Sequence, residues 1–147
     1  MLSIGQVSQM FDLPISTLRY YDNEGLFPNL KRISGVRKFD KTTINTLRLI
    51  ECLKKSGLEI KDIKQFIEWT QQGSQTYEKR LDLLQKQKEN VENEMKKLQK
   101  TQAMLEFKCW YYQTAIKDGN EERLHQMMPD HLPEDIQALY DQIHNDD

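Results

Sequence analysis

Several features that would point to other classes of protein are missing from this sequence. No apolar run approaches the roughly 20 residues that a membrane-spanning helix needs, and no signal peptide opens the chain. We therefore expect a cytoplasmic protein with no membrane partner. Only two cysteines are present, Cys52 and Cys109, so we expect free thiols rather than the disulfide framework of a small secreted protein.

The residue patterns of catalytic and cofactor sites are also missing. The sequence has no glycine-rich phosphate loop, no serine nucleophile elbow and no pair of acids with a nearby histidine. His125, His131 and His144 do not have the spacing of metal ligands. We expect no enzymatic activity, no cofactor and no bound metal.

Charge is unevenly distributed along the chain. The net charge is −2, but residues 1–72 carry eleven Lys and Arg against eight Asp and Glu, whereas residues 73–147 carry ten against fifteen. Eleven consecutive positions hold five basic residues and one acid, and the basic residues are Lys31, Arg32, Arg37, Lys38 and Lys41. Such a local basic face is sufficient for contact with phosphates. The alternative is that these residues only keep a loop soluble.

Two short helices joined by a turn are predicted near the N-terminus. The first covers residues 3–11, with Ser3 and Gln6 at the spacing of a capping box. After the turn, Ser16 can cap a second helix, which Gly25 ends. A connection of about three residues is typical of a helix-turn-helix.

The second of these helices has two different faces. Helical spacing allows Ile15 and Leu18 to face inward, which leaves Thr17, Arg19 and Tyr20 on the outside. An outer face of hydroxyls and a guanidinium is suited to the major groove of DNA.

A hairpin and two further helices are predicted after it. Residues 27–40 alternate short apolar pieces with turn residues, which indicates a hairpin that turns near Ser34 and Gly35. Thr42 can cap the next helix, and Gly57 ends it. Another amphipathic helix then runs from Ile60 and ends near Gly73.

A long apolar seam follows. Its members recur at alternating steps of four and three residues, which is the spacing of a coiled coil, and they are Tyr77, Leu81, Leu84, Lys88, Val91, Met95, Leu98, Gln102, Leu105, Cys109 and Tyr112. Residues 1–73, which precede the seam and are called the head below, are too few to cover it. The seam is therefore expected to pair with a second copy or to fold over its own domain. A solvated spacer fits this pattern poorly. The segment from Asp118 onward is acidic and is expected to be a solvated or disordered end, with a possible short helix from Pro133 to His144.

The N-terminal stretch SIGQVSQMFDLPISTLRYYDNEGLFP resembles the signature of the mercury-resistance-regulator (MerR) family of bacterial transcription factors. The similarity continues over about 115 residues. It implies a mainly α fold with a winged helix-turn-helix DNA-binding domain in residues 1–73. A long antiparallel coiled-coil dimerisation helix is then implied for residues 74–118, and a short acidic helical tail for residues 119–147.

The resemblance also implies partners and contact residues. A homodimer would place two recognition helices on double-stranded promoter DNA and, once triggered, bend and untwist it for RNA polymerase. The matching positions that would bind DNA are Ser16, Thr17, Arg19, Tyr20, Tyr21, Arg37 and Lys38. One tyrosine of the pair could instead be packed inward. Val36 departs from the family, which often has an aromatic residue there.

Two observations bear on the signal. The metal sensors of the family carry cysteines at the start of the dimerisation helix and in a loop after it, where this chain has none. Cys52 matches the single cysteine of a subgroup that responds to reactive aldehydes and other electrophiles. Arg48 and Lys55 lie one helical turn from it, and cations favour the nucleophilic thiolate. The alternatives are that Cys52 is a small buried side chain, that the signal is a non-covalent ligand, or that the protein is architectural and has no sensor.

Overall fold

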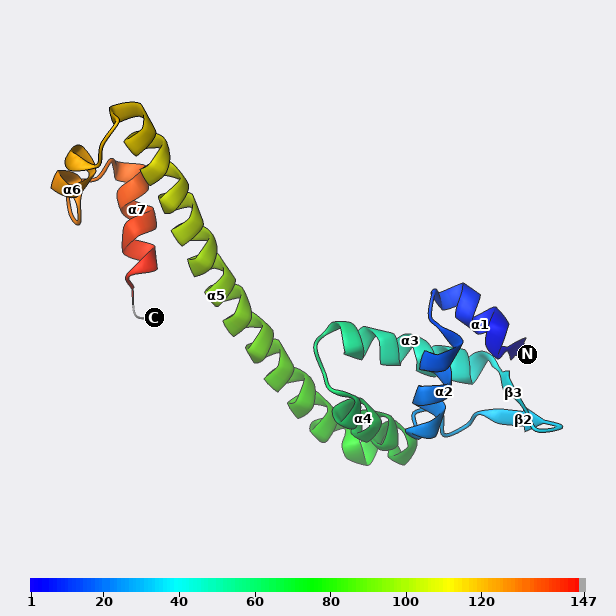
Figure 1. The fold of residues 1–147 in the computed structure, drawn as a ribbon. Coiled ribbons are helices and arrows are strands. Elements are labelled where there is room, and N and C mark those ends of the chain that lie inside the picture. The colour runs from blue at the N-terminus through cyan, green and yellow to red at the C-terminus, as the bar shows by residue number, and fades with distance from the viewer. Residues whose placement is uncertain (146–147) are drawn as a thin grey trace. The chain divides into compact units, whose positions relative to one another are not determined.

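The computed structural model describes residues 1–145 (Figure 1). Most of this part of the chain is helical, and one small sheet lies near its N-terminus. The chain forms two compact units, which are described separately below. The first comprises Met1–Lys88, and the second holds the described residues from Glu89 onward.

The first two helices follow the predicted pattern. Helix α1 is Ile4–Phe11 and helix α2 is Ile15–Asn23. The capping box of α1 is confirmed, because the N–H of Ser3 donates to Oε1 of Gln6 at 2.8 Å and the N–H of Gln6 donates to Oγ of Ser3 at 3.2 Å. Gly25 follows α2 with φ +81°, so the predicted left-handed stop is also confirmed.

The start of α2 differs from the prediction in two respects. Pro14 occupies the N-cap position, and no side chain caps the helix, so the prediction that Ser16 caps it is wrong. Ser16 already lies inside the first turn, where its own backbone is helical. Ile15 is 37% exposed, whereas Leu18 and Tyr21 are buried. The inward face of α2 is therefore formed by Leu18 and Tyr21 and does not include Ile15.

A three-stranded antiparallel sheet contains the predicted hairpin. Its strands are β1 (Leu2–Ser3), β2 (Lys31–Ile33) and β3 (Val36–Phe39), in the order β1-β3-β2. The turn is confirmed at Ser34 and Gly35, which have φ of +52° and +79°. Strand β1 was not predicted, because two residues are too short to show any periodicity.

Helices α3 (Lys41–Lys55) and α4 (Ile60–Gln72) complete the head. The prediction that Thr42 caps α3 is wrong, because Asp40 is the N-cap and its Oδ1 accepts from the N–H of Thr43 at 2.9 Å. The helix therefore begins at Lys41, and its N-cap is the last residue that the sequence assigned to the hairpin. Gly57 has φ +93° just after α3, which confirms the predicted stop.

One hydrophobic core joins these elements. Side chains from both helix pairs and from β3 meet in it, and Leu83 of the next helix packs against them. Its fully buried members include Val7, Leu18, Leu26, Phe39, Leu47, Ile50, Ile63 and Ile67.

Helix α5 is Tyr77–Asp118, with 42 residues, and the short 3₁₀ helix η1 (Gly73–Thr76) leads into it. Arg80, in its first turn, ties this junction together. Its Nε donates to Oγ1 of Thr76, and its Nη2 donates to the carbonyls of Trp69 and Gly73, each at 2.9 Å. One guanidinium thus satisfies carbonyls at the end of α4 that the helix itself leaves open.

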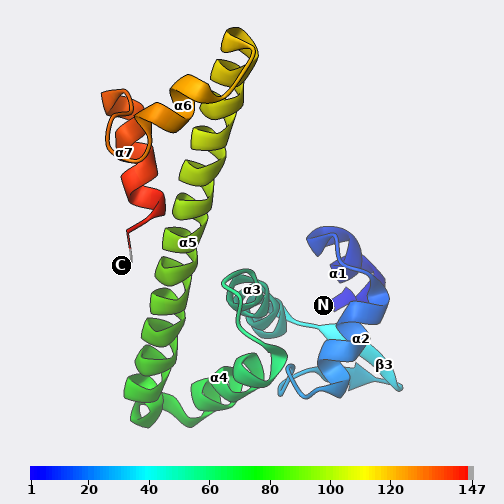
Figure 2. The same cartoon turned by 60° about the vertical axis from the view of Figure 1, so that its left-hand side comes forward.

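The second unit contains the C-terminal helices α6 (Glu122–Met127) and α7 (Glu134–Ile143), which lie alongside α5 in Figure 2. Its buried cluster is Phe107, Tyr111, Leu124, Leu132 and Ile136. The predicted short helix after Pro133 is confirmed. The expectation of a solvated or disordered end is wrong for the described residues, because apolar side chains between the acids pack onto α5.

The exposed fractions of side chains on α5 show that residues 1–145 leave much of its seam uncovered. Eight of its apolar members are between 38% and 69% exposed, namely Tyr77, Leu81, Leu84, Val91, Met95, Leu98, Leu105 and Tyr112. None of the helices in residues 1–145 has both the length and the apolar character required to cross a membrane.

The corrected cap of α3 can be tested by substitution. Asp40→Ala should lower the midpoint of urea unfolding, because the first turn of α3 loses the acceptor for the N–H of Thr43. Thr42→Ala is the matched control, since the exposed Thr42 side chain makes no capping bond. A larger loss in Thr42→Ala than in Asp40→Ala would contradict the assignment.

The same cap predicts a pH dependence. The backbone hydrogen bond from Thr43 lowers the pKa of Asp40 below its ordinary value of 3.8. A carboxylate whose pKa is lower in the folded state stabilises the fold above its unfolded-state pKa, and this contribution is lost as the pH falls through the folded-state pKa. The difference in urea midpoint between wild type and Asp40→Ala should be full above about pH 3.8 and should disappear below the folded-state pKa.

Candidate nucleic-acid interface

The outward face of α2 carries the residues predicted to reach DNA bases. Arg19 and Ser16 are exposed, Tyr20 is 42% exposed and Thr17 is half-buried. Their order on a nine-residue helix follows from Leu18 and Tyr21 facing the core. The result is one face that combines a guanidinium, a phenol and hydroxyls, which are groups able to hydrogen-bond with base edges and phosphates.

Four of the predicted residues also surround one pocket. It has a volume of about 430 Å³, and its lining residues are Ser16, Thr17, Tyr20, Tyr21, Lys54 and Ile60. The structure thus brings α2 together with the C-terminal end of α3 and the start of α4. Sequence reasoning did not include Lys54 and Ile60, because only the packing of three helices places them beside α2.

Tyr21 differs from the other predicted contacts because it is buried. Its side chain is 2% exposed, and its hydroxyl donates to Oε1 of Glu51 and accepts from Nζ of Lys54, both at 3.0 Å. Burial raises the pKa of Tyr21, and the hydrogen bond with Tyr21 raises the pKa of Lys54. Of the two alternatives for the tyrosine pair, Tyr21 is therefore the one packed inward, where it bonds α2 to α3, and Tyr20 is the one at the surface.

The wing is the β2–β3 hairpin, residues 31–39, and an acid on α2 accepts hydrogen bonds from two of its arginines. Arg37 and Lys38 lie on β3 and are half-buried. Nε of Arg37 donates to Oδ2 of Asp22 at 2.7 Å, and Nη2 of Arg32 donates to the same oxygen at 2.8 Å. Sequence reasoning missed Asp22. A turn at Ser34 and Gly35 predicts that Arg32 lies opposite Arg37, but only tertiary packing brings the carboxylate between them.

Cys52 lies on the surface of α3. The alternative that it is a small buried side chain is therefore wrong. The guanidinium of Arg48, which helical spacing places one turn from Cys52, donates to Oδ1 of Asn45 at 3.1 Å and lies over the ring of Phe11, 5.9 Å from its centre. Glu51 and Lys54, which are close to Cys52 in sequence, are the two partners of the Tyr21 hydroxyl.

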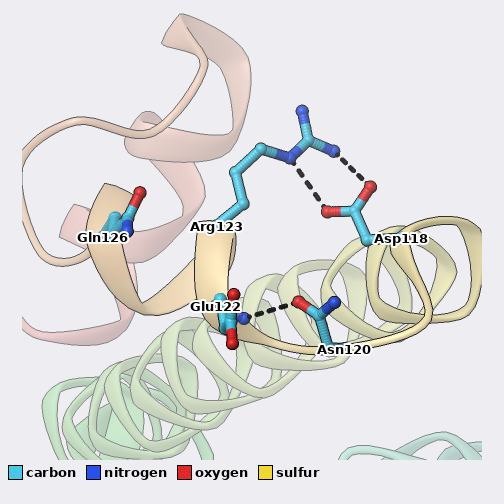
Figure 3. Close-up of a pocket in the computed structure, with 5 residues that line it drawn as sticks. All are labelled: Asp118, Asn120, Glu122, Arg123 and Gln126. Atoms are coloured by element: carbon cyan, nitrogen blue, oxygen red, sulfur yellow. Dashed lines mark hydrogen bonds and ion pairs between the residues drawn. The ribbon is translucent and has the colours of Figure 1, made fainter.

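The loop after α5 forms a second pocket (Figure 3), with a volume of about 410 Å³. Arg123 of α6 reaches back to Asp118 at the end of α5 and donates from Nε and Nη2, at 2.9 and 3.0 Å. The N–H of Glu122 donates to Oδ1 of Asn120 at 3.1 Å. Because both carboxylate oxygens of Asp118 accept from Arg123, this pair fastens α6 to the end of α5 and does not leave Asp118 open for a cation.

The chain matches two family models. Residues 2–68 match the model described as MerR HTH family regulatory protein, and residues 44–106 match the model described as MerR, DNA binding. An uncharacterised HTH-type transcriptional regulator of Haemophilus influenzae is 43% identical over 105 residues, which cover 71% of this chain and 78% of that protein.

Solved structures agree with the family models. HiNmlR, a MerR family regulator lacking the sensor domain, solved bound to promoter DNA, is 37% identical, with a TM-score of 0.66 over 80% of this chain and 94% of that one. A MerR family regulator from Bacillus thuringiensis is 40% identical, with a TM-score of 0.62 over 74% of this chain and 96% of that one. The winged helix-turn-helix fold and these relatives together show that this chain belongs to the MerR family of transcriptional regulators.

Proposed function

We propose that this MerR family regulator acts as a homodimer that binds double-stranded promoter DNA through α2 and the wing, and that electrophiles reacting with Cys52 change the DNA geometry presented to RNA polymerase. The observation that carries the proposal is the exposed face of α2 with Thr17, Arg19 and Tyr20, next to the basic hairpin β2–β3. HiNmlR was solved bound to promoter DNA, which supports the same role for the matching unit here.

The two parts of this surface are expected to do different work. Side chains on a recognition helix read base edges in the major groove, whereas wing residues contact phosphates and fix the register. Arg19 is the strongest candidate for base reading, because an arginine can donate two bonds to one guanine. Arg37 and Lys38 on β3 are candidates for phosphate contact. The buried Tyr21 is proposed to act indirectly, by holding α2 against α3.

Substitution of Arg19 tests the DNA-reading surface. The probe is a duplex that the wild-type protein selects from a random-sequence pool. Arg19→Ala should weaken its binding by about 1–3 kcal/mol and relax the sequence preference at one position, as expected for loss of a bidentate base contact. Arg123→Ala, which removes the same charge from the other unit, should bind normally. Normal binding by Arg19→Ala would show that α2 is not the recognition helix.

The exposed seam of α5 supports the dimer. Contiguous apolar patches of this kind are uncommon on monomers and usually mark an interaction site. The residue spacing matches a coiled-coil seam, so a second α5 is the partner whose side chains would fit it. We propose an antiparallel pair, which would place Tyr77 of one protomer near Tyr112 of its partner.

Charges placed in the seam test the dimer. Leu84→Lys combined with Leu98→Lys should give monomers that bind the selected duplex weakly, because two ammonium groups per helix would have to be buried in the interface. Analytical ultracentrifugation measures the assembly. Asn93→Lys adds a charge to the same helix at an exposed position outside the seam, and it should remain dimeric. A stable dimer of the Leu84→Lys, Leu98→Lys protein would place the interface elsewhere.

The position of Cys52 supports a covalent signal. Its thiol is exposed, and a thiolate can add to an aldehyde carbonyl carbon: a C–S bond forms, the C=O π electrons move to oxygen, and that oxygen takes a proton from water. An adduct would form on the same helix as Glu51 and Lys54, which hydrogen-bond the hydroxyl of Tyr21 of α2. A change there could alter how α2 is seated, as in other switches that act through a local packing change.

A solved relative also bears on the signal. HiNmlR is described as a MerR family regulator lacking the sensor domain, which favours a signal received without a separate ligand domain. A non-covalent ligand remains the second candidate for the signal. The architectural alternative is less well supported, because the relatives are transcriptional regulators.

Cysteine substitution separates these signals. Cys52→Ser should bind the selected duplex as wild type does but lose the transcriptional response to formaldehyde or methylglyoxal, because a hydroxyl is a far weaker nucleophile than a thiolate. Cys109→Ser, which changes the other exposed cysteine, should keep the response. In vitro transcription from a promoter carrying the selected duplex measures both. A full aldehyde response in Cys52→Ser would favour a non-covalent ligand.

A further inference from the structure

Asp22 lies where the recognition helix meets the wing. It belongs to the last turn of α2, and its Oδ2 accepts from Arg32 on β2 at 2.8 Å and from Arg37 on β3 at 2.7 Å. A single carboxylate oxygen thus joins all three elements. The side chain of Asp22 is only 13% exposed, and that of Arg37 is 21% exposed.

The register of the hairpin explains why a carboxylate is needed there. Arg32 and Arg37 are direct partners in the antiparallel β2–β3 ladder, so their side chains leave the same face of the hairpin. Like charges directly opposite each other destabilise a sheet pair. Asp22 lies between the two guanidinium groups and offsets their repulsion, so both cations can stay on the face that meets α2.

The bonds also leave the arginines able to bind DNA. A guanidinium has five N–H donors, and Arg37 uses the one on Nε for Asp22. Donors on its terminal nitrogens remain for a phosphate oxygen. The three residues together carry a net charge of +1, so the cluster still attracts phosphate while its geometry is set from α2.

We propose that Asp22 is a positioning residue for DNA recognition: it fixes Arg32 and Arg37 relative to α2, so that the wing and the recognition helix engage the same duplex in one register, without touching DNA itself. This inference rests on the proposed function. It has an unusual consequence, because an acid next to a phosphate-binding surface would then strengthen specific binding.

The direction of the change in affinity tests the proposal. If Asp22 acted only as a negative charge, Asp22→Asn would bind every duplex more tightly. If it positions the arginines, Asp22→Asn should bind the selected duplex on the order of tenfold more weakly, while binding to a scrambled duplex of the same length should be unchanged or tighter. Asp22→Glu, which retains a carboxylate acceptor, should restore most of the binding to the selected duplex.

Two controls isolate the role of position from that of charge. Asp12→Asn removes the same charge from the turn before α2, where the exposed Asp12 has φ +52° and asparagine is well tolerated. In a protein that already carries Arg32→Ala and Arg37→Ala, Asp22→Asn should no longer weaken binding, since residues that act through one another are not additive. Binding by Asp22→Asn as tight as that of Asp12→Asn would overturn the proposal.

A measurement on the wild-type protein covers the case in which Asp22→Asn does not fold. The Nε–H of Arg37 can be followed by nitrogen-15 NMR, and its hydrogen bond to Asp22 should protect it from exchange. Positioning requires that this protection persist when the selected duplex is added. Loss of protection on DNA binding would show that the bond between Arg37 and Asp22 breaks in the complex, and it would overturn the proposal. If the wild-type protein selects no duplex at all, the proposed function itself fails, which is a separate outcome.

Discussion

The recognition helix α2 has only nine residues, and a helix of that length is not stable in water by itself. Its position therefore depends on what it packs against, which is α1 and the core of the first unit. Leu18 and Tyr21 are buried in the core that they share with α3, and the hydroxyl of Tyr21 is hydrogen-bonded to Glu51 and Lys54. Leaving such a hydroxyl buried without partners would cost about 1–3 kcal/mol. The apolar contacts hold α2 in place, and the two polar bonds fix its rotation about its own axis, which decides which side chains face outward.

Much of the head could be predicted because its signals are local. A capping box, the glycines that follow α2 and α3, and a two-residue turn are encoded within a few residues, and Ser3, Gly25 and Gly57 act as expected. The errors occurred where neighbouring residues offered the same chemistry. Ser16 and Thr42 are both good caps by residue type, but the chain enters α2 and α3 earlier, at Pro14 and Asp40. A pattern of residue types does not define the first helical residue when several candidates are adjacent.

The parts of the site that could not be predicted depend on contacts between elements that are distant in sequence. Asp22 meets Arg37, and Tyr21 meets Glu51, only after α2, α3 and the sheet have packed. Arg48 is a similar case, since its guanidinium lies over the ring of Phe11 on α1, a contact that helical spacing within α3 does not predict. The C-terminal segment was misjudged from its acidic composition. A few apolar side chains, Leu124 and Ile136 among them, are sufficient to bury it against α5.

The junction between α4 and α5 has a mechanical consequence. A loop of flexible residues would let each helix turn about its axis independently. Here one guanidinium, that of Arg80, bonds three oxygens at the end of α4 and in η1, so the first turn of α5 is fastened at three points. A rotation of this turn would either break the hydrogen bonds of the Arg80 guanidinium or move α4 as well. The first turn of α5 and the end of α4 are therefore expected to move together. Because α4 contributes to the core against which α2 packs, a rotation of α5 at this end would also displace the recognition helix.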